Sequence, residues 1–177
     1  MSHTDTPWSR LASRTARGLL SRKGVAYDDL AERLRALGLR DSVRAVEGKV
    51  LRGSYRCTFF LQLLNALNSE YPAQWTQVLE TDSTWEEMAR HIYLLELSGH
   101  NLTFRQVSKR LVKFGINIAP EALEEQIVAG DYPFVLLLQL ALAVPIKGFE
   151  RFVDARDIVQ TAGEETSKPS PGTDGVA

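Results

Sequence analysis

The residues best suited to chemistry lie on one short amphipathic stretch, residues 43–52. Its apolar face carries valines at helical spacing: Val43, Val46 and Val50. Its other face, together with the residue before it, carries polar side chains: Ser42, Arg44, Glu47 and Lys49. Arginine pairs with guanine in the major groove, and lysine reaches bases or phosphates. The stretch therefore predicts a helix that contacts DNA, and the alternative is an ordinary solvated helix face.

Further cations surround this predicted helix. Five arginines are suited to phosphate contacts: Arg14, Arg17, Arg40, Arg52 and Arg56. Residues 1–70 carry 12 Lys and Arg against 7 Asp and Glu, a net charge of +5, whereas residues 71–177 carry 9 against 15, a net charge of -6. This asymmetry, hidden in an overall charge of -1, favours an anionic partner for the first part of the chain, unless it is ordinary surface variation.

The chain contains two copies of one unit. Residues 8–68 align without a gap with residues 85–145, and identical residues recur along the alignment: Trp8 with Trp85, Gly38 with Gly115, Gly53 with Gly130 and Tyr55 with Tyr132. A repeat of this kind indicates the architecture before any local pattern does. Each copy is about the size at which a helical unit can just bury a core of its own.

Each copy is predicted to contain four helices, with the possibility of a fifth after it. In copy one, glycines suited to helix ends follow the first three: Gly24, Gly38 and Gly53. Pro120 is suited to a first helical position, and by the alignment it places the start of the third helix at Val43, with Ser42 as its N-cap. Pro133 by the same argument places the start of the fourth helix at Arg56.

The predicted fold class is therefore all-α, with two tandem four- to five-helix domains. The expected organisation has four parts: a flexible N-terminus at residues 1–7, a basic copy one at 8–80, an acidic copy two at 85–160 and a disordered tail at 161–177.

The order of signals in copy one resembles the phage-repressor-like helix-turn-helix superfamily, in which a short second helix positions a third in the DNA major groove. Residues 24–34 match the pattern Gly-Val-x-Tyr-x-x-Leu-Ala-x-x-Leu, and Arg-Gly and Phe-Phe-Leu-Gln follow at 52–53 and 59–62. These signatures resemble more closely a family of uncharacterised small bacterial domains. The resemblance to the repressor superfamily implies a helix-turn-helix-type domain and DNA binding, as in a small bacterial transcriptional regulator, whereas the uncharacterised family implies no activity. Compared with the usual repressor unit, residues 35–41 lengthen the interval between the second and third helices by about one helical turn. A longer interval changes the angle between these helices, and that angle decides whether the third helix enters the groove.

Copy two has a different surface at the same place. Arg44 corresponds to Glu121 and Lys49 to Gln126. An acidic face repels phosphate, so DNA binding is not expected there. Copy two is expected to serve assembly or partner binding, or to be a duplicate retained for stability.

The fourth helix of copy two is apolar almost all round, which indicates cover on more than one side. Either the two copies pack over it or it forms a homodimer contact. The side chains expected in a protein interface are Phe134, Leu137, Leu138, Leu140 and Leu142.

Enzyme chemistry has little support in the sequence. The histidines His3, His91 and His100 are scattered, and no metal-site spacing, phosphate loop or serine elbow occurs. No enzyme activity, cofactor, metal or small-molecule substrate is therefore expected. The start of the chain lacks a signal peptide and the longest apolar run, residues 134–144, is too short to span a bilayer, so a cytoplasmic protein is expected. Cys57 is expected to be a small core residue. The alternative function is a protein–protein interaction adaptor that does not bind DNA.

Overall fold

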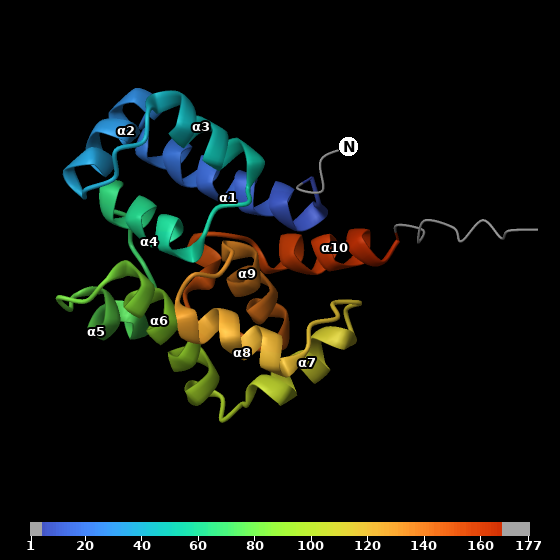
Figure 1. The fold of residues 1–177 in the computed structure, drawn as a ribbon. Coiled ribbons are helices and arrows are strands. Elements are labelled where there is room, and N and C mark those ends of the chain that lie inside the picture. The colour runs from blue at the N-terminus through green and yellow to red at the C-terminus, as the bar shows by residue number, and fades with distance from the viewer. Residues whose placement is uncertain (1–4, 168–177) are drawn as a thin grey trace, which may run out of the picture.

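The computed structural model describes residues 5–167, and this part of the chain is helical without any strand (Figure 1). Four helices form copy one: α1 (Pro7–Lys23), α2 (Tyr27–Ala36), α3 (Val43–Arg52) and α4 (Cys57–Ala66). Four corresponding helices form copy two: α6 (Trp85–Gly99), α7 (Phe104–Val112), α8 (Pro120–Ala129) and α9 (Phe134–Ala143). The predicted all-α class with two tandem domains is confirmed.

A shorter segment follows each copy. After copy one come a 3₁₀ turn and one helical turn: η1 (Ala73–Trp75) and α5 (Thr76–Leu79). After copy two come a 3₁₀ turn and a longer helix: η2 (Phe149–Arg151) and α10 (Ala155–Thr166). In both copies the first helix packs on the third, and the second packs on the third and fourth. The repeat in sequence is therefore a repeat in tertiary structure.

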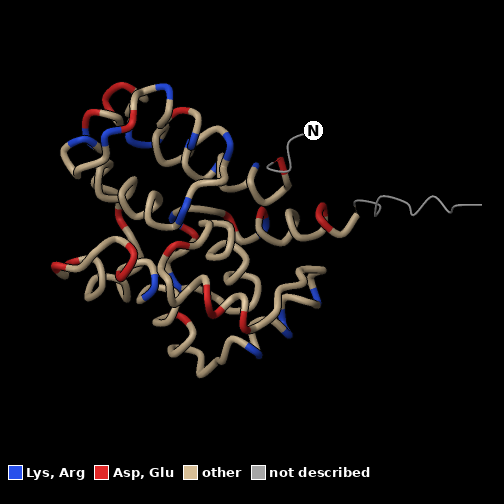
Figure 2. Tube along the Cα trace, viewed as in Figure 1, with Lys and Arg blue, Asp and Glu red and all other residues tan. Residues whose placement is uncertain are grey.

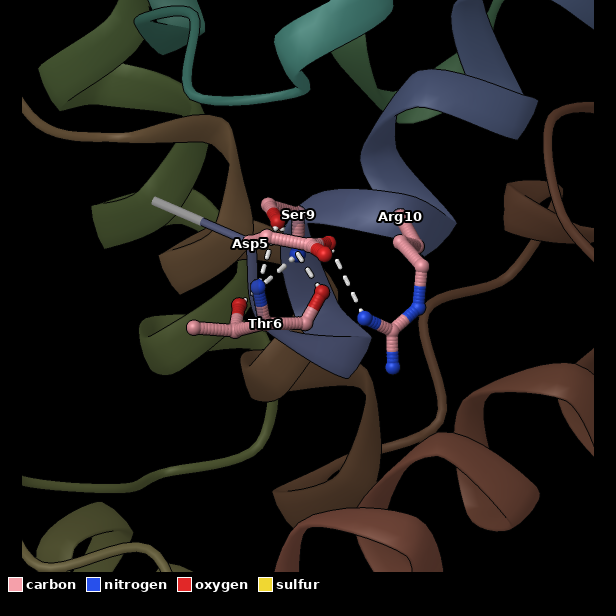
Figure 3. A network of polar contacts seen from close by, with 4 residues as sticks. All are labelled: Asp5, Thr6, Ser9 and Arg10. Atoms are coloured by element: carbon pink, nitrogen blue, oxygen red, sulfur yellow. Dashed lines mark hydrogen bonds and ion pairs between the residues drawn. The ribbon is translucent and has the colours of Figure 1, made fainter. Parts of the chain in front are cut away.

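Residues 1–7 were predicted to form a flexible N-terminus, but regular structure begins within this segment, at Thr6 and Pro7. Thr6 caps α1, accepting a hydrogen bond from the Ser9 amide at 3.1 Å, while Ser9 Oγ accepts one from the Thr6 amide at 2.9 Å (Figure 3). Arg10 also pairs with Asp5 at 2.9 Å. This capping box satisfies two amides that the first helical turn leaves without partners, so the helix begins at Pro7. Residues 1–4 lie outside the described part.

Two start positions of the later helices were predicted correctly, and two are displaced by one residue. Ser42 caps α3 by accepting a hydrogen bond from the Ala45 amide at 3.2 Å, and Pro120 is the first residue of α8, as expected. Pro133 and Arg56 were expected to begin their helices but are instead the N-cap residues, in extended backbone conformation. Proline is stable in both places because neither requires a backbone N–H.

The predicted disordered tail at 161–177 begins too early. Helix α10 starts after Asp154, whose carboxylate accepts a hydrogen bond from the Arg156 amide at 2.8 Å, and continues to Thr166. Ile158, Thr161 and Ala162 are buried on its inner face. The sequence allowed a fifth helix after copy two, but the polar composition after residue 160 gave no sign that this helix continues to Thr166. The remainder of the tail, residues 168–177, lies outside the described part.

A glycine and a tyrosine attach the third helix of each copy to the first. Gly53 ends α3 with φ +66°, so close to α1 that a Cβ there would lie 1.7 Å from the Ser9 carbonyl oxygen. Two residues later, the Tyr55 hydroxyl donates a hydrogen bond of 2.6 Å to the Ala12 carbonyl of α1. Copy two repeats both contacts: Gly130 against Glu86, and Tyr132 to Ala89 at 2.6 Å. The identical Gly-x-Tyr spacing in both copies is therefore structural.

The two copies meet through a reciprocal pair of backbone hydrogen bonds. The Cys57 amide donates to the Tyr132 carbonyl at 2.8 Å, and the Phe134 amide donates to the Tyr55 carbonyl at 3.0 Å. Cys57 corresponds to Phe134 and Tyr55 to Tyr132, so exchanging the copies maps one bond onto the other. The bonds flank the antiparallel bridge formed by Arg56 and Pro133. The copies are thus related by a pseudo-twofold axis, as in an isologous dimer.

Each trailing segment packs on the first helix of the other copy. Helix α5 follows copy one and contacts α6, whereas α10 follows copy two and lies against α1 (Figure 1). Trp75 and Phe152, at corresponding positions, stack with ring centroids 5.8 Å apart. Phe60 and Phe134 stack at 4.0 Å nearby. The exchange joins both copies around one aromatic core.

Of the two alternatives for the apolar α9, packing between the copies accounts for four of the five residues expected in an interface. The side chains fully enclosed within the chain are Phe134, Leu137, Leu138 and Leu140. Helices α1 and α4 of copy one, together with α7 and α10, cover them. Leu142 is half-buried and lines a cavity. The near-uniform apolarity of α9 reflects packing between the copies, which uses the same surfaces that a second chain would need.

The close approach at Gly53 predicts the outcome of an alanine substitution. Gly53→Ala should lower the free energy of unfolding by more than about 3 kcal/mol, because Cβ and the Ser9 carbonyl cannot occupy the same space. Gly24→Ala is the matched control, since Gly24 has a similar φ of +62° but open space around it, and should cost only about 1 kcal/mol. Urea unfolding measures both, and equal losses would contradict the assigned role of Gly53.

Candidate nucleic-acid interface

Helix α3 lies on the surface of copy one with its polar face outward. Val46 and Val50 are fully buried against α1 and α2, which fixes how the helix is turned. Ser42 and Arg44 are exposed, as the sequence predicted for residues that reach a partner. Figure 2 shows Lys and Arg distributed over α1–α3 and acidic residues along α8.

Two of the predicted contact residues are partly buried, and one of them, Lys49, is held by its neighbours. The ammonium of Lys49 lies 2.6 Å from the Asp41 carboxylate and 5.5 Å from the centre of the Phe59 ring. Glu47 is half-buried beside Tyr27 and Arg17. Partial burial raises the pKa of Tyr27, the negative charge of Glu47 raises it further and Arg17 opposes the rise. Lys49 therefore helps to fix α3 on its support.

The arginines around α3 divide into two groups. In the first are exposed guanidinium groups that form no ion pair within residues 5–167: Arg14, Arg17, Arg40, Arg44 and Arg52. Arg52 folds back along α3 over Gly48, whose missing side chain makes room for it. Arg56 belongs to the second group, because it lies at the junction of the copies, where it pairs with Asp131 at 3.4 Å. Arg56 thus holds copy two rather than extending the surface of α3.

The corresponding surface of copy two has the opposite charge. Helix α8 has the same burial pattern as α3, with Leu123 and Ile127 in the core, and its exposed acids are Glu121, Glu124 and Glu125. Among the described residues, none of these three forms an ion pair. The scaffold is shared, so the difference between α3 and α8 lies in their surfaces alone.

Sequence reasoning missed the partners that hold Lys49 and Arg56. Asp41 lies eight positions before Lys49, beyond the reach of helical spacing, and Asp131 belongs to the other copy. Neither partner had a signal in the sequence. The sequence of copy one alone does not indicate that Arg56 pairs with a residue of copy two.

The comparisons with known proteins show the family. The model of one family, described as Domain of unknown function (DUF6471), matches the chain twice, at residues 8–71 and 85–149. The chain belongs to this family as a tandem pair of its domains. No curated protein and no solved structure matches the chain.

The described residues form neither a metal-binding cluster nor a membrane-spanning helix. Between residues 5 and 167, no group of three or more His, Cys, Asp or Glu is placed to hold a metal ion. No helix in that range combines the length and apolarity needed to cross a bilayer. Cys57 is fully buried, as expected of a core residue.

The burial of Cys57 predicts how its thiol reacts. Loss of solvent raises the pKa of the Cys57 thiol to about 12, partly offset by a hydrogen bond with Tyr132. At about pH 9 an unfolded cysteine is largely thiolate, whereas Cys57 stays protonated. Iodoacetamide should therefore label the native protein at least about a hundredfold more slowly than the urea-unfolded protein at that pH. Equal rates would show that the junction of the copies opens freely.

Proposed function

We propose that the protein binds DNA through copy one, as a small transcriptional regulator, with α3 lying in the major groove. The observation that carries the proposal is the unpaired cationic surface around α3, set against the acidic surface of α8 on the same scaffold. A duplex attracts such a surface through its phosphates and repels an acidic one. Copy two then serves as the support of copy one.

The residues divide into roles by position. Arg44, in the first turn of α3, is placed to read a base edge, because the N-terminal part of a recognition helix enters the groove. Ser42 and the free α3 amides at its side suit a phosphate, since a helix N-terminus attracts anions. Arg40 and Arg52 flank the helix and Arg14 extends from α1, so they suit the phosphates on either side. Lys49 acts by holding the helix.

A second candidate is an adaptor that binds a protein through the same helix. Val43 and Leu51 on α3 are 40% and 52% exposed, and apolar side chains on an exposed face suit a protein partner. The counterpart of Leu51 in copy two, Val128, is 47% exposed as well. Because exposed apolar residues are common singly on protein surfaces, the cationic set favours DNA.

The proposal predicts salt-dependent binding of a labelled random duplex, measured by fluorescence anisotropy. Each phosphate contact contributes about 0.9 to the slope of log affinity against log salt, so the three arginines assigned to phosphates give a slope of about -3. Arg44→Glu/Arg52→Glu should abolish binding at moderate salt. Neither residue is part of an ion pair, so the fold should be retained.

Arg105→Glu/Lys109→Glu is the matched control. It makes the same change in charge on exposed residues of α7 in copy two, and should leave most of the affinity intact. Equal losses in the two double variants would mean that net charge alone binds the duplex. No binding of the duplex at low salt would exclude the regulator and favour the adaptor.

A further inference from the structure

An open cavity of about 630 Å³ lies in copy two, and no residue of α3 or α8 lines it. Helices α6 and α9, the segment from η2 to α10, and Gln74 of η1 contribute to its wall, most of which is apolar. Phe114, Leu142, Phe149 and Ile158 are among the residues that line it. Its volume falls within the range of cavities that bind small organic molecules.

One buried carboxylate interrupts the apolar wall. The side chain of Glu96 is 5% exposed, and its Oε1 accepts hydrogen bonds from Trp75 Nε1 at 2.7 Å and Gln74 Nε2 at 3.1 Å. Within residues 5–167, no hydrogen bond reaches Oε2, and this oxygen is not sealed from the cavity. The two donors fix the carboxylate and leave an acceptor without a protein partner.

The other charged groups around the cavity do not neutralise Glu96. Lys147 and Glu150 lie at its rim, both exposed, and Lys147 forms no ion pair with Glu96 in the described structure. His100 Nε2 is within hydrogen-bond distance of the Pro145 carbonyl, at 3.1 Å. The site therefore has two acids against one lysine and a histidine whose ring is already engaged.

In copy one, a side chain covers the place that corresponds to this cavity. The pseudo-twofold axis places Leu19 where copy two has Glu96, and Arg22 where it has Gly99. Arg22 crosses the opening and donates a hydrogen bond of 2.7 Å to the Arg151 carbonyl, and Arg151 pairs with Glu70 beside it. The remaining hollow measures about 270 Å³. Copy two lacks the covering side chain, because the residue there is Gly99. Open space surrounds the position that a Cβ would take.

We propose that the cavity in copy two binds a small molecule with an apolar body and a protonated nitrogen, which donates a hydrogen bond to Glu96. A carboxylate shielded from water binds a cation more strongly than it binds a neutral donor. The apolar wall supplies the rest of the affinity by removing the ligand body from water. The inference does not rest on DNA binding by α3.

Three ligands of similar shape and different charge test the proposal: the 2-phenylethylammonium ion, 2-phenylethanol and phenylacetate. Nitrogen-15 NMR follows the indole N–H of Trp75, which reports directly on Glu96. The ammonium ion should bind at least about tenfold more tightly than the alcohol, as expected of a charge-assisted hydrogen bond. Phenylacetate should not bind, because its charge repels the carboxylate.

Two variants and one control make the test specific. Glu96→Gln keeps an acceptor for Trp75, and should bind the ammonium ion no better than the alcohol. Gly99→Arg introduces the covering side chain of copy one. It should weaken the binding of the ammonium ion and of the alcohol alike, while the Trp75 indole resonance of the free protein stays in place. Glu150→Gln removes an exposed rim charge and should preserve the order of the ligands.

Three outcomes would overturn the proposal. The first is equal affinity of the wild-type protein for the ammonium ion and the alcohol. The second is an unchanged preference for the ammonium ion in Glu96→Gln. The third is the absence of any shift of the Trp75 indole with all three ligands at millimolar concentration, which would make Glu96 a structural carboxylate only.

Discussion

The reciprocal hydrogen bonds between the Tyr55–Cys57 and Tyr132–Phe134 segments are the constraint on which the whole structure depends. They join the two copies at the strand-like links that precede the fourth helices, where each tyrosine also reaches back to the first helix of its own copy. A contact between the copies is thereby transmitted to the packing within each copy. Because the amide of each link donates to the carbonyl of the other, the duplication stabilises both copies at once.

A symmetric scaffold lets the two copies differ elsewhere. The exposed faces of α3 and α8 lie outside the core, so α3 can be cationic and α8 acidic without a change of fold. The same holds for the trailing segments, where copy one is closed by Arg22 and copy two opens onto Glu96. Residues that recur in both copies, such as Gly53 and Tyr55, serve the fold. Those that differ between the copies are where function is to be sought.

Much of the local structure could be predicted from the sequence, because caps and glycine turns act over a few residues. Ser42, for example, was identified as an N-cap from its alignment with Ala119, which precedes a proline. The contacts across the axis could not be predicted this way, since no local signal pairs Arg56 with Asp131. Burial of α9 was correctly expected, but its partners depended on where α10 packs. The second half of α10 was missed because its composition is polar, and only its buried face shows the amphipathic pattern.

Native-state hydrogen exchange of the full chain tests most directly whether the copies form one cooperative unit. The account predicts that the amides of Cys57 and Phe134 exchange only through global unfolding, with the same free energy as the core amides of α1 and α6. Faster exchange at Cys57 and Phe134, with the cores of both copies still protected, would contradict it. The copies would then be independent domains that happen to touch, and the junction would not hold them together.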